Sequence, residues 1–181
     1  MDDPEEFHKI LTIYDQYPVS ELIIHPRVRK DFYRHPVRYE SFDNAVSSCK
    51  MPVTLNGGIV TITDYQNYAA KYPKLKAIMV GQGMVSDPFL ADRIKLGVCS
   101  DSALLRCFHD ELYFAYAELF QSRNNAVKRM KELWFYLIQL FDGGERLGKC
   151  ILKSRASDEY ETAVSRVFGE LVVRNESLGG W

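Results

Sequence analysis

Three short apolar runs, each followed by a helical pattern, constrain the fold of this 181-residue sequence more than any other feature. The runs cover residues 21–24, 52–55 and 77–80. Helices are predicted over residues 4–16, 39–49 and 61–71, with a further short helix after Asp87-Pro88. Strands that alternate with helices at this spacing pair in parallel and are joined by right-handed crossovers. The sequence therefore predicts an α/β fold.

Two of these helices begin with capping signals. Asp3, Pro4 and Glu6 match an N-cap, a proline at the first helical position and the acidic partner of a capping box. Thr61 and Asp64 form a second capping box by their spacing. The helices should therefore start close to residues 4 and 62.

Each predicted strand is followed by residues that a buried core would not favour. His25 follows the first run, Asn56-Gly57-Gly58 the second and Gly81-Gln82-Gly83 the third. Ligands of α/β folds bind at this carboxyl edge of the sheet, and glycines there let backbone amides approach a phosphate. The pattern indicates a phosphate site of the kind that (β/α)8 barrels build. Ordinary glycine turns and a hydrogen-bonded structural histidine remain the alternatives.

A second, all-helical part follows. Apolar residues at helical spacing predict helices over residues 101–121 and 127–141, and a further helix capped by Ser157. We therefore expect an α/β part over residues 1–97 and a helical bundle over residues 98–181; the resemblance given below implies that the first part is a partial (β/α) barrel. The aromatic residues of the bundle are interpreted as core rather than as a platform for nucleic-acid bases.

Local charge is more informative than the net charge of -1. Residues 121–155 contain eight basic and three acidic residues, an excess that suits a polyanionic partner. Another basic run follows His25; it comprises Arg27, Arg29, Lys30, Arg34 and Arg38. A solvated surface explains both sets as well.

Several other classes of protein are not indicated. Cys49, Cys99, Cys107 and Cys150 form no CxxC pair, so neither a metal site nor a disulfide framework is predicted. No apolar run approaches the roughly 18 residues of a membrane span, and the acidic first nine residues do not suit a signal peptide. The expectation is a cytoplasmic protein with no membrane partner.

Four motifs carry a resemblance to a known family: ELIIHPRVRKDFYR, PVTLNGGIVTITDYQNY, KAIMVGQGMVSDPFLADRI and VKRMKELWFYLIQLF. Together they resemble the C-terminal part of bacterial tRNA-dihydrouridine synthases, flavoprotein oxidoreductases of tRNA processing. The resemblance implies a TIM (β/α)8 barrel that holds FMN, followed by a helical domain that binds tRNA. It also implies that NADPH reduces the flavin, that the hydride goes to the uracil ring and that a cysteine supplies the proton.

The resemblance assigns the FMN contacts to six residues: His25, Asn56, Gly57, Gly58, Gly81 and Gln82. Gln82 replaces the family's usual arginine, which removes a charge-assisted hydrogen bond to the phosphate but leaves the backbone amides in place. Gly58 replaces a more common aspartate and removes a side-chain acceptor. RNA contacts are expected from Arg27 and Arg29 beside the barrel edge and from Lys128 and Arg129 in the bundle.

The same resemblance leaves part of the enzyme unaccounted for. A (β/α)8 barrel takes about 250 residues, and this sequence supplies only what resembles its last three strands. The family's proton-donor cysteine would lie upstream of Met1, so no catalytic residue is assigned within the sequence. We therefore expect this chain alone to be inactive, with an exposed strand edge that pairs with a missing barrel half or with a second copy.

Two alternatives remain open at this point. One is a non-catalytic tRNA-binding module. The other is part of a different phosphate-binding barrel, which leaves the basic helical appendage unexplained.

Overall fold

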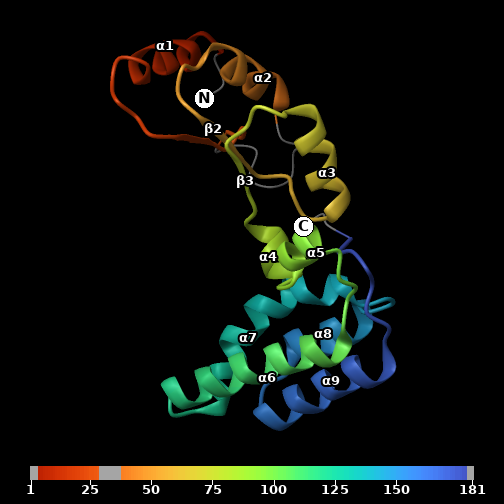
Figure 1. Cartoon of the computed structure of the whole chain (residues 1–181). Helices are drawn as coiled ribbons and strands as arrows, with labels where there is room; N and C mark the ends of the chain where they lie inside the picture. The colour runs from red at the N-terminus through yellow and green to blue at the C-terminus, as the bar shows by residue number, and fades with distance from the viewer. Residues whose placement is uncertain (1–3, 29–37, 179–181) are drawn as a thin grey trace. The chain divides into compact units, whose positions relative to one another are not determined.

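The computed structural model describes residues 4–28 and 38–178 (Figure 1). These residues form two compact units, one ending at Gly81 and the other running from Gln82 to Gly179. The boundary predicted after residue 97 falls within the second unit. Each unit is described by itself.

The first unit alternates helices and strands, as predicted from the sequence. In chain order its elements are α1 (Pro4–Tyr14), β1 (Leu22–Ile24), α2 (Tyr39–Ser48), β2 (Val53–Asn56), α3 (Ile62–Lys71) and β3 (Ala77–Met79). α1 ends two residues earlier than expected. The predicted capping box is present, because Thr61 accepts from the Asp64 amide and Asp64 accepts from the Thr61 amide.

The three strands form one parallel sheet in the order β1-β2-β3. Leu22 pairs with Val53, and Leu55 pairs with Ile78. One face packs against the helices through a core that contains Ile24 and Leu55, together with Leu11, Phe42, Ala45, Val53, Ile59 and Tyr72. The predicted α/β class is therefore confirmed for this unit.

The opposite face of the sheet is largely uncovered by the described residues. Ile23 is 50% exposed and Met79 is 47% exposed. Among the described residues, β1 and β3 each pair with a single neighbouring strand. Parallel sheets normally bury both faces and most of their strand edges, so this sheet has room for further strands.

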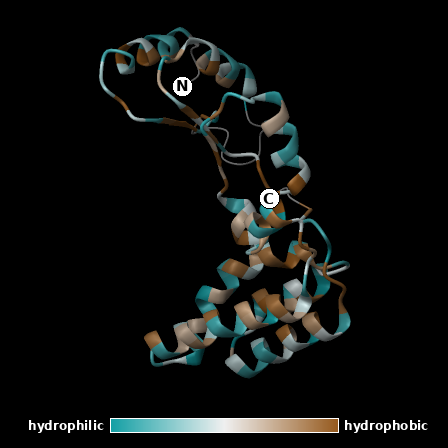
Figure 2. Ribbon diagram, in the orientation of Figure 1, coloured by the Kyte–Doolittle hydropathy of each residue, from teal (hydrophilic) through white to brown (hydrophobic). Residues whose placement is uncertain are grey.

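The second unit is helical. Its elements are α4 (Gln82–Ser86), α5 (Leu90–Leu96), α6 (Ser102–Leu119), α7 (Arg123–Leu137), the 3-10 helix η2 (Ile138–Leu140), α8 (Glu145–Lys153) and α9 (Ser157–Glu170). Asp101 caps α6 and Ser122 caps α7 through their side chains. Figure 2 shows hydrophobic and hydrophilic residues interspersed along these helices, as expected for amphipathic helices.

Three details of the second unit differ from the sequence prediction. Helix α4 was not predicted, because Gln82 and Gly83 were assigned to the glycine turn after the third strand. Helix α8 was not predicted, because Gly143, Gly144 and Gly148 interrupt its helical pattern. Ser157 is not the N-cap that we predicted; it is the first helical residue, and the cap position is Ala156, which makes no side-chain cap bond. The Ser157 amide instead donates to Asn124 Oδ1 on α7 over 2.9 Å.

The core of the bundle is aromatic, as predicted, and contains a polar network. Trp134 and Tyr160 are fully buried, and His109 is 2% exposed. Trp134 Nε1 donates to the Tyr160 hydroxyl over 2.8 Å, and that hydroxyl lies 2.7 Å from His109 Nε2.

Among the described residues, no helix combines the length and the apolar character that crossing a membrane requires.

Candidate functional site

The predicted site residues of the first unit gather at the carboxyl edge of its sheet. Ile24 pairs with Leu55, so His25 and Asn56 follow at the same level of neighbouring strands. Asn56 in turn pairs with Met79, two residues before Gly81. The parallel register therefore brings together three strand ends that are far apart in the sequence.

His25 packs directly on the glycine turn after β2. Gly57 has φ +106°, a backbone conformation that residues other than glycine rarely adopt. A Cβ at Gly57 would lie 2.8 Å from His25 Cε1 and 2.9 Å from His25 Nδ1. Gly57 is thus required both by the backbone and by the imidazole ring. The next residue, Gly58, also has a positive φ, +75°.

The imidazole of His25 is held toward its neutral form. Partial burial of the ring and the nearby Arg27 guanidinium lower its pKa, and hydrogen bonds with Asn56 oppose this shift without cancelling it. A neutral imidazole has one donor and one acceptor nitrogen. His25 can therefore donate one hydrogen bond to a ligand at this edge or accept one from it.

Gly81 differs from Gly57 because neither its backbone conformation nor a close neighbour requires a glycine. Its φ is not in the left-handed region, and no residue in the described part of the chain lies within 4 Å of the Cβ that another residue would place there. The residue is exposed. Open space beside an exposed backbone at a strand end fits a phosphate group, which backbone amides can then approach. Gln82 begins α4 in the second unit.

Of the residues predicted to contact RNA in the first unit, Arg27 is half-buried, two positions beyond His25. Its backbone amide donates to the His25 carbonyl over 2.7 Å, so the turn that carries it is tied to the end of β1. Arg29 lies outside the described residues.

Lys128 and Arg129 are exposed on α7 in the second unit. Lys128 Nζ donates to Asn125 Oδ1 over 3.2 Å, and Arg129 forms an ion pair with Glu132 at 3.2 Å. Lys131 is less available because its ammonium donates to the Ser154 carbonyl. Four further basic residues are exposed on or just after α8: Arg146, Lys149, Lys153 and Arg155.

The environments of the four cysteines do not point to a reactive thiol or to a metal ligand. Cys49 is half-buried, and burial together with Asp15 raises the pKa of its thiol, which lowers its reactivity. Cys99, Cys107 and Cys150 are exposed. Among the described residues, no group of three or more histidines, cysteines and carboxylates could hold a metal ion.

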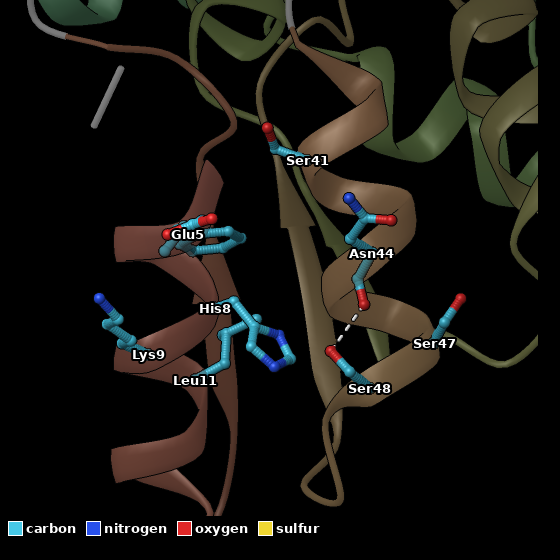
Figure 3. A pocket seen from close by; sticks show the side chains of 9 residues that line it. Glu5, His8, Lys9, Leu11, Ser41, Asn44, Ser47 and Ser48 are labelled. Carbon is cyan, nitrogen blue, oxygen red and sulfur yellow. Dashed lines mark hydrogen bonds between the residues drawn. The ribbon is translucent and has the colours of Figure 1, made fainter. Parts of the chain in front are cut away.

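The structure also contains an open cleft that sequence reasoning missed (Figure 3). It lies between α1 and α2, has a volume of about 650 Å³, and is lined by Glu5, Phe7, His8, Lys9, Leu11, Ser41, Asn44, Ser47 and Ser48. The Ser48 hydroxyl donates to the Asn44 carbonyl of its own helix over 2.7 Å. None of the predicted site residues lines this cleft.

A family model described as "Dihydrouridine synthase (Dus)" matches residues 1–162. The chain belongs to the dihydrouridine synthase family. The family predicted from the four motifs is thereby confirmed.

The chain matches only part of the length of three related dihydrouridine synthases. The tRNA-dihydrouridine(16) synthases of Cupriavidus necator and Ralstonia nicotianae are each 34% identical over 76 residues, which is 42% of this chain and 23% of each relative. The tRNA-dihydrouridine synthase B of Pasteurella multocida is 27% identical over 97 residues, or 54% of this chain and 29% of that relative. The matched region thus spans about a quarter of these relatives.

Proposed function

We propose that this chain contributes to the reduction of uridine to 5,6-dihydrouridine in tRNA, with FMN as cofactor and NADPH as reductant. The observation that carries this proposal is the family match over residues 1–162. The alignment of His25, Asn56 and Gly81 at one sheet edge supports it, because that edge is where α/β folds bind their ligands.

In this proposal, FMN when bound would supply hydride transfer to the uracil ring. His25 contacts the flavin through its exposed imidazole. Asn56 and Gly57 fix the orientation of this imidazole. The backbone amides of the Asn56-Gly57-Gly58 turn bind phosphate oxygens, and so do those of Gly81 and Gln82. Gln82 offers a neutral side-chain amide rather than a charged donor, so backbone geometry carries most of the recognition.

We assign tRNA binding to the helical unit and to the start of the basic run after β1. Lys128 and Arg129 are exposed on α7, within a segment that carries an excess of basic residues. Such residues neutralise phosphates and position a nucleic acid without reading its bases. Arg27 and Arg29 would contact the RNA backbone near the flavin.

We further propose that turnover needs strands that these 181 residues do not supply. The three parallel strands act as the C-terminal part of a (β/α)8 barrel, and further strands pair with the edge of the sheet and cover Ile23 and Met79. We assign the proton-donor cysteine to that other part, since none of the four cysteines here lies in one of the four motifs that carry the family resemblance. Pairing with a second copy of this chain would be the alternative way to cover the edge.

The test uses tRNA transcribed without modifications, FMN, NADPH and mass spectrometry of the digested nucleosides. The 181-residue chain alone should form no dihydrouridine. Co-purification with the part of the Cupriavidus necator synthase that precedes the aligned region should produce it. The first position to examine is 16, because two relatives are named for it. Product from the chain alone would contradict the need for added strands, and no product from the complemented protein would overturn the reductase proposal.

One alternative is favoured by a specific observation, the exposed basic residues of α7 and α8. In this alternative the chain is a tRNA-binding module without chemistry. The complemented reaction distinguishes the two, because a pure binding module would hold tRNA and form no dihydrouridine.

A further inference from the structure

The segment that follows the Gly81-Gln82-Gly83 turn contains a fully buried ion pair. Arg93 Nη1 donates to Asp87 Oδ2 over 2.6 Å, and the two side chains are only 2% and 3% exposed. Burying two charges costs free energy that their attraction repays only with good geometry, so an apolar pair would often stabilise the fold equally well. The pair therefore calls for an explanation beyond stability.

Asp87 connects this pair to Gly83. Its backbone amide donates to the Gly83 carbonyl over 2.8 Å, and the Ser86 hydroxyl donates to the same carbonyl over 3.0 Å. Its carboxylate also accepts from the Phe89 amide over 3.1 Å. Pro88 restricts the backbone of Asp87 to non-helical conformations, so α4 ends here. A single residue thus ties Gly83 to α5.

The guanidinium of Arg93 makes this contact while one of its donors stays unpaired. Its Nε is buried and has no hydrogen-bond partner among the described residues. A side chain selected only for stability would be expected to satisfy such a donor. The arrangement instead fixes the Asp87 carboxylate in one position.

We infer that Asp87 and Arg93 are positioning residues for the Gly81-Gln82-Gly83 turn, and that they set its backbone amides for a phosphomonoester, the phosphate of FMN. The inference rests on the proposed function, which assigns this turn to the phosphate. Arg93 acts through Asp87, and Asp87 acts through Gly83. Because Gln82 carries no charge, the orientation of the amides determines how tightly the phosphate is held.

The experiment compares FMN with riboflavin, which has the same ring system and no phosphate. The variant is Asp87→Asn combined with Arg93→Met, which removes both charges without leaving one buried and unpaired. The amide oxygen of the introduced asparagine can still accept from the Phe89 amide. The matched control is Arg166→Met with Glu170→Gln, which removes an exposed ion pair of 2.7 Å on α9. Dissociation constants are measured from flavin fluorescence, and melting temperatures check the fold.

The double variant should bind FMN about tenfold more weakly than the wild-type chain, the effect of losing one hydrogen bond to a charged group. Riboflavin affinity should not change, and the control should match the wild type for both ligands. An unchanged FMN preference, or an equal loss for both flavins, would overturn the inference, because a merely structural role predicts one of those results. If the double variant does not fold, Asp87→Asn combined with Arg93→Gln decides, because it also removes both charges: a retained FMN preference in that variant also overturns the inference.

A different result separates this inference from the proposed function. If the wild-type chain binds FMN no more tightly than riboflavin, the phosphate assignment itself fails and the inference fails with it. If the wild type prefers FMN and the variants do too, only the inference fails.

Discussion

At the scale of single residues, Gly57 and Gly81 show that two glycines at strand ends can be present for different reasons. Gly57 has a positive φ and lies against the His25 ring, whereas Gly81 has neither constraint. Both were predicted to form one kind of phosphate turn. The sequence could not separate them, because the backbone angle and the approach of a distant imidazole appear only in the fold.

This difference predicts opposite outcomes for the same substitution. Gly57→Ala should destabilise the first unit by about 2 kcal/mol or more, since it combines an unfavourable backbone conformation with a clash against His25. Gly81→Ala serves as the control and should leave stability within about 0.5 kcal/mol, since its Cβ would meet open space. Denaturant unfolding of both variants measures the effect. Equal destabilisation of the two would contradict the packing of His25 on Gly57.

At the scale of elements, Tyr160 joins three helices of the bundle. Its hydroxyl accepts from Trp134 on α7 and lies 2.7 Å from His109 Nε2 on α6, while Tyr160 itself is on α9. His109 Nδ1 lies 2.8 Å from Asp110 Oδ1, so the neutral ring carries its proton on Nδ1 and accepts at Nε2. Burial lowers the pKa of His109, which favours that neutral form.

Tyr160→Phe should therefore lower the free energy of unfolding, although it removes only the hydroxyl oxygen. It would leave the Trp134 indole N–H and His109 Nε2 buried without partners, which costs about 2–4 kcal/mol in unfolding free energy. Tyr113→Phe is the comparison, because Tyr113 donates to only one group, Glu161, which is half-buried. Its loss should cost about 1 kcal/mol. Similar losses for the two variants would contradict the prediction that the Tyr160 hydroxyl satisfies two buried groups at once.

The elements also show what the sequence could and could not predict. Strand and helix alternation, the capping box at Thr61 and the helical bundle all follow from local periodicity, and all are present. Helix α8 was missed because glycines interrupt its pattern. A Cβ at position 148 would lie 2.8 Å from Ile138 Cγ1, so a larger residue there would force the Ile138 side chain to move. The Asp87–Arg93 pair was missed as well, because nothing in a sequence marks two charged residues as buried.

At the scale of the whole molecule, charge is distributed unevenly although the net charge is only -1. Residues 121–155 hold eight basic and three acidic residues, while α9 holds four acidic residues and one basic residue. An RNA should therefore meet the helical unit through α7 and α8 rather than through α9. This preference is electrostatic, so it should weaken with salt in proportion to the number of phosphates contacted.

The salt dependence of tRNA binding tests this preference for α7 and α8. In titrations of tRNA at several salt concentrations, Lys128→Ala with Arg129→Ala should weaken binding. It should also reduce the slope of log affinity against log salt by about two units, one for each phosphate that is no longer neutralised. Arg166→Ala, on α9 and paired with Glu170, should leave the slope unchanged. A weaker affinity with an unchanged slope would mean that Lys128 and Arg129 support the helix without touching phosphate. The RNA contacts would then have to be sought among the exposed basic residues of α8.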